Sequence, residues 1–242
     1  MRAPADLTVT AEQRTEFARL MTGGRMNVYD AAVTLAAQKH QVTVDPIDLY
    51  VYNMALAGAL LGPLHMLEVV TRNAMHHELT AYAGREDWWV RGSRVTLLER
   101  HYERIDEFEG KVVRDLKGSR AVVPGDIVAA SDLGFWTGLL GKGSRDGADY
   151  ERLWVDATRL AFPNTRQNRY QIWPKYNAMR ALRNRVGHHE HIFRTDAKRN
   201  LSTIVELVGF ISAPLAEWAD DRSRVVGVLG RHPFTGTPVT HF

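Results

Sequence analysis

Helical patterning dominates this chain, because apolar residues recur at helical spacing and no long run of β-branched residues alternates with polar ones. Two helix starts are clear. Thr10 or Thr8 is a candidate N-cap for a helix that begins at Ala11. Asp45 is followed by Pro46, which combines an N-cap with proline at the first helical position. The sequence therefore predicts an all-α fold.

The spacing of apolar and capping residues predicts helices over residues 11–21, 27 or 30 to 40, 47–61, 64–82, 95–116, 127–140, 149–161, 166 or 168 to 187, 196–219 and 221–229. We expect Gly62 and Pro63 to kink or break the long apolar segment, and Pro174 and Pro214 to bend two later helices. No repeat and no linker is evident. One domain over 1–242 is the simplest prediction, with 1–25 and 231–242 as peripheral terminal segments.

Several classes of protein are disfavoured by composition. The chain has no cysteine, which excludes disulfides, thiolate metal sites and a thiol nucleophile. Its first residues lack the apolar core of a signal peptide. The most apolar stretch, 54–67, is interrupted by Gly62-Pro63, so we interpret it as a buried helix that is too short to span a membrane. A cytoplasmic protein without a membrane segment is expected.

Positive charge is concentrated in one segment. Between residues 166 and 199 there are nine Lys or Arg against two acids, a net charge of +7, so the rest of the chain carries −4 of the total of +3. A local basic field on a mildly acidic body is typical of proteins that bind polyanions. The alternative is a solvated helix face. The basic residues are Arg166, Arg169, Lys175, Arg180, Arg183, Arg185, Arg194, Lys198 and Arg199.

One motif in this segment has residues suited to RNA chemistry. If its helix persists to Gly187, then Arg180, Asn184 and His188 share one face at spacings of i, i+4 and i+8, and the long side chain of Arg183 can reach the helix end. A guanidinium binds phosphate oxygens, and an imidazole can exchange a proton with a 2′-hydroxyl or a leaving 5′-oxygen. By spacing alone, a histidine that compensates the helix dipole is the simpler interpretation.

A second group of polar residues lies on the apolar helix. Glu68, Arg72 and His76 occur at i, i+4 and i+8, and glutamate before arginine is the favourable order for an ion pair. One interpretation is a half-buried polar strip that locks this helix against the helix of Arg183. The other is that Arg72 or His76 contributes to the same pocket, with Glu68 holding Arg72 or Arg183 in place.

The histidines that follow the motif allow a metal interpretation. His188 and His191 are spaced i, i+3, Glu190 could be a further ligand, and His76-His77 could add to the set. The arrangement lacks the spacing of known zinc motifs and has few carboxylates nearby, so we predict no metal. We expect His189 and His191 to bind phosphate or shape the entrance of the site, with Arg185 as a further substrate-binding or supporting residue.

Most aromatic residues are expected in the core, namely Phe135, Trp136, Trp154, Phe162, Trp173 and Trp218. Trp88 and Trp89 lie in a predicted loop, where packing over the bundle is favoured over stacking on bases. Tyr170 and Tyr176 flank the basic segment, and they are the better candidates for contacting a single strand.

Several segments together resemble the Abi-like (abortive infection) bacterial proteins of the HEPN superfamily. The run 182–193 (LRNRVGHHEHIF) is similar to the family signature, and 67–73 (LEVVTRN) looks like its LExxxRN helix. Further similar segments, in the family's order, are 124–128 with 134–136, 150–154, and 162–163. The resemblance covers roughly Asp45 to Pro233.

This resemblance implies an all-α HEPN-like helical bundle with additional N- and C-terminal helices. In active members an Arg-x4–6-His motif is the centre of a metal-independent endoribonuclease, which identifies Arg183 and His188 as the motif pair and Asn184 as the polar residue after the arginine. HEPN proteins commonly form dimers in which two motifs line one cleft. Gly187 departs from the pattern, because a small residue such as alanine is expected there.

The prediction from sequence is therefore a cofactor-free, homodimeric endoribonuclease that cleaves RNA by 2′-hydroxyl attack, in phage defence or as a toxin with a neutralising antitoxin. Its centre would be Arg183, Asn184 and His188. The rival prediction is a non-catalytic HEPN module that binds RNA or a protein, since many relatives have lost catalysis and fold alone does not fix function. A third reading is a hydrolase that uses the histidine cluster to bind a metal.

Overall fold

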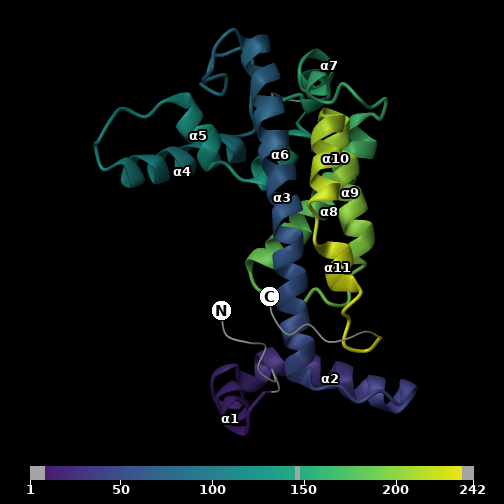
Figure 1. The fold of residues 1–242 in the computed structure, drawn as a ribbon. Coiled ribbons are helices and arrows are strands. Elements are labelled where there is room, and N and C mark those ends of the chain that lie inside the picture. Colours follow the sequence, from purple (N-terminus) through teal and green to yellow (C-terminus); the bar gives the residue numbers. More distant parts are fainter. Residues whose placement is uncertain (1–8, 145–147, 236–242) are drawn as a thin grey trace. The chain divides into compact units, whose positions relative to one another are not determined.

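The computed structural model describes residues 9–144 and 148–235, and every regular element in these ranges is a helix (Figure 1). The prediction of an all-α fold is confirmed. The elements, in chain order, are α1 (Ala11–Leu20), α2 (Thr22–His40), α3 (Pro46–Ala83), α4 (Glu99–Leu116), α5 (Pro124–Ala130), α6 (Leu133–Leu139), α7 (Tyr150–Asp156), the 3-10 helix η1 (Thr158–Ala161), α8 (Arg169–Gly187), α9 (Ala197–Ile211), α10 (Ala213–Asp221) and α11 (Val225–Leu229).

The chain forms two compact units. Unit 1 comprises Met1–Gly62, Arg185–Arg199 and Ser223–Phe242, and unit 2 comprises Pro63–Asn184 and Asn200–Arg222. The helices α3, α8 and α9 each contribute residues to both units. A single domain stays a prediction.

Unit 1 is organised around polar and aromatic contacts of α3. The Asn53 side-chain oxygen accepts hydrogen bonds from the backbone N–H groups of Ile192 (2.7 Å) and Phe193 (3.1 Å). The ring of Tyr29, on α2, packs at 5.3 Å from those of Tyr50 and Phe193. These contacts fix the segment that follows α8 against α2 and α3.

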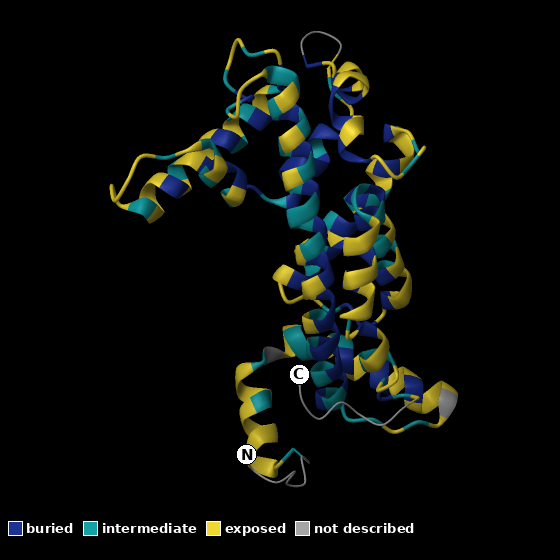
Figure 2. Ribbon diagram, turned by 45° about the horizontal axis from the view of Figure 1, so that its top comes forward, coloured by how far each residue is buried: buried dark blue, intermediate teal, exposed yellow. Residues whose placement is uncertain are grey.

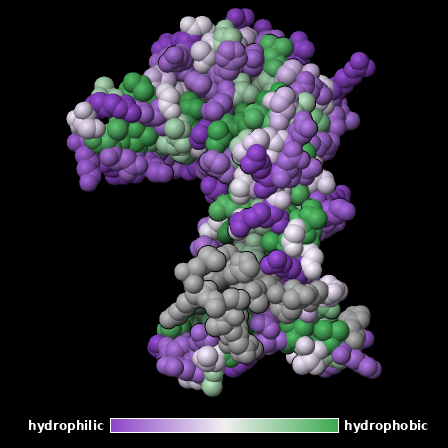
Figure 3. Space-filling model, in the orientation of Figure 1, coloured by the Kyte–Doolittle hydropathy of each residue, from purple (hydrophilic) through white to green (hydrophobic). Residues whose placement is uncertain are grey.

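Unit 2 is built from the second half of α3, most of α8 and α9, and the helices between them. Buried residues follow the sides along which these helices meet (Figure 2), and a hydrogen bond of 2.8 Å joins the hydroxyls of Thr71 on α3 and Tyr176 on α8. The helix α4 packs on α5 and α6. Figure 3 shows hydrophilic and hydrophobic residues mixed on the surface. In unit 2, Val113 on α4 and Val123 at the start of α5 are exposed apolar side chains.

The helix α3 passes through Gly62-Pro63 without interruption, so the prediction of a break there is wrong. Interior proline costs about 3 kcal/mol. Each fully buried leucine returns about 1.5–3 kcal/mol, and Leu56, Leu60 and Leu64 are all buried around this site. By length and composition alone, the uninterrupted α3 could cross a membrane, and less than half of its apolar window is buried. The argument that the apolar stretch is too short therefore fails.

Other boundaries differ because three predicted helices are each divided into two shorter ones. The segment 127–140 is two helices, since Asp132 caps α6 by accepting a hydrogen bond from the Phe135 N–H (2.9 Å). Similarly, 149–161 is divided into α7 and η1, and 196–219 is divided at Ser212, with Pro214 at the start of α10. The predicted starts at Thr10 and Asp45 are correct: Thr10 forms a capping box, and the Asp45 carboxylate accepts from the Ile47 N–H. Glycines 23 and 24 lie inside α2 and do not separate it from α1 by a loop.

Candidate functional site

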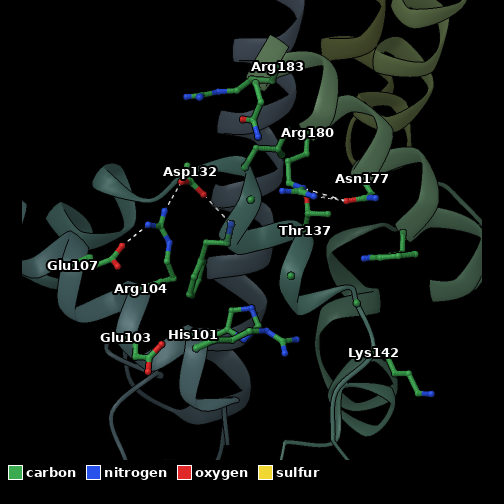
Figure 4. A pocket seen from close by; sticks show the side chains of 18 residues that line it. His101, Glu103, Arg104, Glu107, Asp132, Thr137, Lys142, Asn177, Arg180 and Arg183 are labelled. Carbon is green, nitrogen blue, oxygen red and sulfur yellow. Dashed lines mark hydrogen bonds and ion pairs between the residues drawn. The ribbon is translucent and has the colours of Figure 1, made fainter. Parts of the chain in front are cut away.

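A cleft of about 730 Å³ opens in unit 2 (Figure 4). Its walls come from α4, from α6 with the residues on either side of it, and from α8. Two residues of the predicted motif, Arg183 and Asn184, line it, and so does Arg180. The predicted phosphate-binding side chains therefore meet in one cavity large enough for a nucleotide.

One face of α8 supplies an entire wall of this cleft. Trp173, Asn177, Arg180 and Asn184 follow one another at spacings of four, three and four residues, which places them on one stripe of a helix. The Asn177 carbonyl oxygen accepts hydrogen bonds from Arg180 Nε (3.1 Å) and Nη2 (2.9 Å). The guanidinium of Arg180 is thus oriented by a neutral partner, and it keeps its full charge for a ligand.

The cleft has an excess of positive charge. Five cations and three carboxylates line it, but Arg104 forms an ion pair of 2.5 Å with Asp132 and a second one with Glu107. Among the residues that the structure describes, Arg100, Lys142 and Arg180 have no carboxylate partner. An anion that enters the cleft meets unpaired cations, which is the arrangement needed to bind phosphate.

Arg183 is held from one side by the helix α3. Its Nε lies 3.4 Å from Glu68 Oε2, and the Glu68 side chain is largely buried. Within the described chain, the guanidinium of Arg183 donates no hydrogen bond. The ion pair therefore orients the guanidinium, and its N–H groups remain available to a ligand.

The other two members of the α3 group have structural partners. Arg72 donates to the Ala129 carbonyl (2.9 Å), and no ion pair joins it to Glu68 in the described residues. His76 Nδ1 accepts a hydrogen bond from Trp88 Nε1 (3.0 Å), and burial lowers the pKa of this histidine. Neither side chain lines the cleft. Of the three residues in this group, only Glu68 contacts the helix of Arg183, through its ion pair with that arginine.

His188 lies immediately after the last residue of α8 and is exposed. It belongs to unit 1, whereas Arg183 and Asn184 belong to unit 2. The helix ends in a Schellman arrangement, in which the His189 N–H bonds to the Val186 carbonyl (3.1 Å) and the Glu190 N–H bonds to the Arg185 carbonyl (2.9 Å). His189 occupies the left-handed position (φ 57°) that glycine usually takes. Gly187 is thus the last helical residue and does not form the turn.

The remaining candidates stabilise this helix end. Arg185 donates to the His191 carbonyl and lies 3.4 Å from a Glu190 oxygen. The His189 carbonyl accepts from Arg25. Burial, with help from nearby arginines, lowers the pKa of His191. The imidazoles of His188 and His189 are both exposed, and neither makes a hydrogen bond or ion pair with a described residue, so both are available to a ligand.

The charge of the basic segment is partly neutralised by acids elsewhere in the chain. Arg169 is almost fully buried, and its Nη2 lies 2.5 Å from Glu151. Lys175 pairs with Glu206 at 2.5 Å. With the pair of Arg183 and Glu68 described above, at least three of the nine cations have a carboxylate partner outside the segment, while Arg185 pairs with Glu190 inside it. The positive potential at the surface of this segment is therefore smaller than its net charge of +7 suggests.

Three aromatic predictions are wrong. Tyr176 is completely buried and hydrogen-bonded to Thr71, so it cannot contact a nucleic acid. Trp173 and Trp218, which were expected in the core, are 38% and 49% exposed. Tyr170 is exposed, as its predicted role requires. Trp88 and Trp89 are buried, which agrees with packing and excludes base stacking by Trp88.

Sequence reasoning missed His101, a buried histidine on α4 that lines the cleft. The hydroxyl of Tyr150 accepts a hydrogen bond from the Leu98 N–H (3.1 Å) and forms a second hydrogen bond of 2.6 Å with His101 Nδ1. A Cβ at Gly138 would stand 2.4 Å from His101 Nε2, so only glycine fits there. Burial, followed by the charge of Arg100, lowers the pKa of His101 to about 4.

This histidine makes stability depend on pH. Its pKa is about 4 when folded and 6.5 when exposed, so the unfolded chain binds the proton more tightly. The stabilisation is complete above pH 6.5 and is lost as pH falls toward 4, which amounts to about 2 kcal/mol between pH 7 and pH 5. We expect the free energy of unfolding of His101→Phe, measured with urea, to lose this dependence on pH. The exposed His77→Phe serves as the control, and an unchanged pH slope in His101→Phe contradicts the assignment.

Among the described residues, no group of three or more His, Asp or Glu side chains is arranged to hold a metal ion. A scan against protein-family models found no match for this chain, and searches of curated proteins and of solved structures found none either. The resemblance of the motifs to Abi-like HEPN proteins therefore stays a prediction.

Proposed function

We propose that this protein is a metal-independent endoribonuclease of the HEPN type, acting in phage defence or as a toxin. The observation that carries the proposal is the cleft in which Arg180, Arg183 and Asn184 lie with Arg100 and Lys142, two cations without a carboxylate partner among the described residues. The oriented guanidinium of Arg183 suits a phosphate whose charge increases in the transition state.

In the proposed reaction, the 2′-oxygen of a ribose attacks the adjacent phosphorus while a base takes its proton. The bond from phosphorus to the 5′-oxygen breaks, and that oxygen receives a proton from an acid. The products are a 2′,3′-cyclic phosphate and a 5′-hydroxyl. Arg183 stabilises the phosphorane charge, Asn184 positions the phosphate, and His188 performs one of the two proton transfers. A homodimer would supply a second histidine for the other transfer.

The proposal predicts that cleavage needs no divalent metal. Purified protein should cut single-stranded RNA at the same rate with and without EDTA, because an arginine and an imidazole provide the charge stabilisation and proton transfer. The measurement is the initial rate on end-labelled RNA, with a magnesium-dependent nuclease as the control for chelation. Activity that disappears with EDTA and returns with magnesium or manganese contradicts this mechanism.

The second candidate is a non-catalytic RNA-binding module. It is favoured by the environment of His188, whose imidazole has no hydrogen-bond partner among the described residues to orient it. This alternative predicts that the protein binds RNA without cutting it, and that any growth inhibition in cells survives His188→Ala. Loss of inhibition in that variant favours the nuclease.

A further inference from the structure

The α8 wall of the cleft combines an aromatic surface with phosphate-binding groups. Trp173 is 38% exposed, and it lies two helical turns before Arg180 on the same stripe, about 10 Å along the axis. A ligand that contacts both must carry a flat apolar group at some distance from an anion. A nucleotide has this chemistry.

The position of the indole is fixed by the backbone that follows α6. A Cβ at Gly141 would stand 3.1 Å from Trp173 Nε1, so glycine lets the indole approach this segment closely. The same backbone is anchored from behind, because the buried Arg169 donates to the carbonyls of Leu140 (3.1 Å) and Gly141 (2.5 Å). Trp173 is therefore an exposed aromatic side chain on a rigid support, which reduces the entropy cost of stacking on it.

Cations and amides accompany the indole along the cleft. Lys142 directly follows the anchored Gly141, and Arg180 is oriented by Asn177. Neither cation has a carboxylate partner in the described chain. Phosphate groups on either side of a base that stacks on Trp173 would meet these charges. The Asn177 amide nitrogen offers donors to ribose or base edges, and the Asn184 amide offers both donors and an acceptor.

From this arrangement we infer that the stripe of Trp173, Asn177, Arg180 and Asn184 binds an unpaired nucleotide of single-stranded RNA, with its base stacked on Trp173. The inference rests on the proposed function in taking RNA as the ligand, and it specifies the substrate class as unpaired RNA. Bases of an A-form duplex are stacked on one another, and their faces are closed to an indole inside a cleft.

The experiment measures binding separately from cleavage. All variants carry His188→Ala, and fluorescence anisotropy follows a short labelled oligoadenylate, its duplex with oligouridylate, and competition by AMP. Trp173→Ala should weaken single-strand binding by about tenfold, because one stacked base is lost. Trp173→Phe should retain most of the affinity. The matched control is Trp218→Ala, which removes an indole of similar exposure on α10 and should leave affinity unchanged.

Three results would overturn the inference: unchanged single-strand affinity in Trp173→Ala, equal affinity for the duplex, or AMP binding as tight as that of the oligonucleotide. Circular dichroism and urea unfolding verify that each variant is folded. Binding that depends on Trp173 in a protein that does not cut RNA supports the inference while the nuclease proposal fails. Conversely, if cleavage depends on Arg183 but Trp173→Ala does not change RNA affinity, the inference is rejected and the nuclease proposal stands.

Discussion

Replacing Arg183 by alanine should lower the rate of RNA cleavage by about 10²–10³-fold, the cost typical of losing one preorganised group that stabilises transition-state charge. The Arg183 guanidinium donates no hydrogen bond to a described residue, and its ion pair with Glu68 orients it. His188→Ala should lower the rate by about 10²–10⁴-fold through loss of proton transfer. Single-turnover rates on end-labelled RNA measure both effects.

Matched controls separate these effects from a general loss of charge. Arg152, on α7, has a side chain that is 79% exposed, and the exposed His77 lies on α3. Alanine at either position should leave the rate within about twofold, as expected for surface substitutions. A rate for Arg183→Ala equal to that of Arg152→Ala shows that the cleft is not the reaction site.

Replacing Arg169 by alanine should reduce the free energy of unfolding by about 3 kcal/mol, the largest stability effect expected near the cleft. The buried guanidinium makes an ion pair with the half-exposed Glu151 and hydrogen bonds with the buried carbonyls of Leu140 and Gly141, and its loss removes the partner of both carbonyls. Urea unfolding at neutral pH measures the change.

The outcome for Arg169 distinguishes a structural cation from a ligand-binding one. Arg152→Ala again provides the control, since its exposed ion pair should contribute well under 1 kcal/mol. Arg169→Met keeps the apolar stem and should recover only part of the loss. An unfolding free energy within about 0.5 kcal/mol of wild type would show that Arg169 does not anchor the end of α6.

Local signals predicted the helix starts well. Thr10 and Asp45 cap their helices through hydrogen bonds to backbone N–H groups two or three residues away, so the sequence alone contains the interaction. Pro63 shows the limit of local rules. The free-energy cost of an interior proline can be predicted from the local sequence. The compensating burial of leucines on either side of Pro63 depends on residues elsewhere in the chain, so it cannot.

The candidate site was predictable only in part. Arg180 and Asn184 share a face because both lie on one uninterrupted stretch of α8. The hydrogen bond between His101 and Tyr150 joins residues 49 positions apart, and no spacing indicates it. The burial of Tyr176 and Arg169 likewise depends on contacts with α3, α6 and α7. These contacts lie far away in the sequence, so the pattern of the segment itself does not indicate them. The spacing of Trp173, Asn177, Arg180 and Asn184 places them on one side of a helix, which the sequence alone indicates. The sequence does not indicate that Trp173 is exposed.

The central claim is that Arg183 and His188 cleave RNA through 2′-hydroxyl attack. Its most direct test is the chemistry of the fragment ends produced in EDTA by the wild type and by the double variant Arg183→Ala/His188→Ala. The account predicts fragments ending in 2′,3′-cyclic phosphate with the wild type and intact RNA with the double variant. Fragments with 3′-hydroxyl ends, or equal cleavage by the double variant, would contradict it.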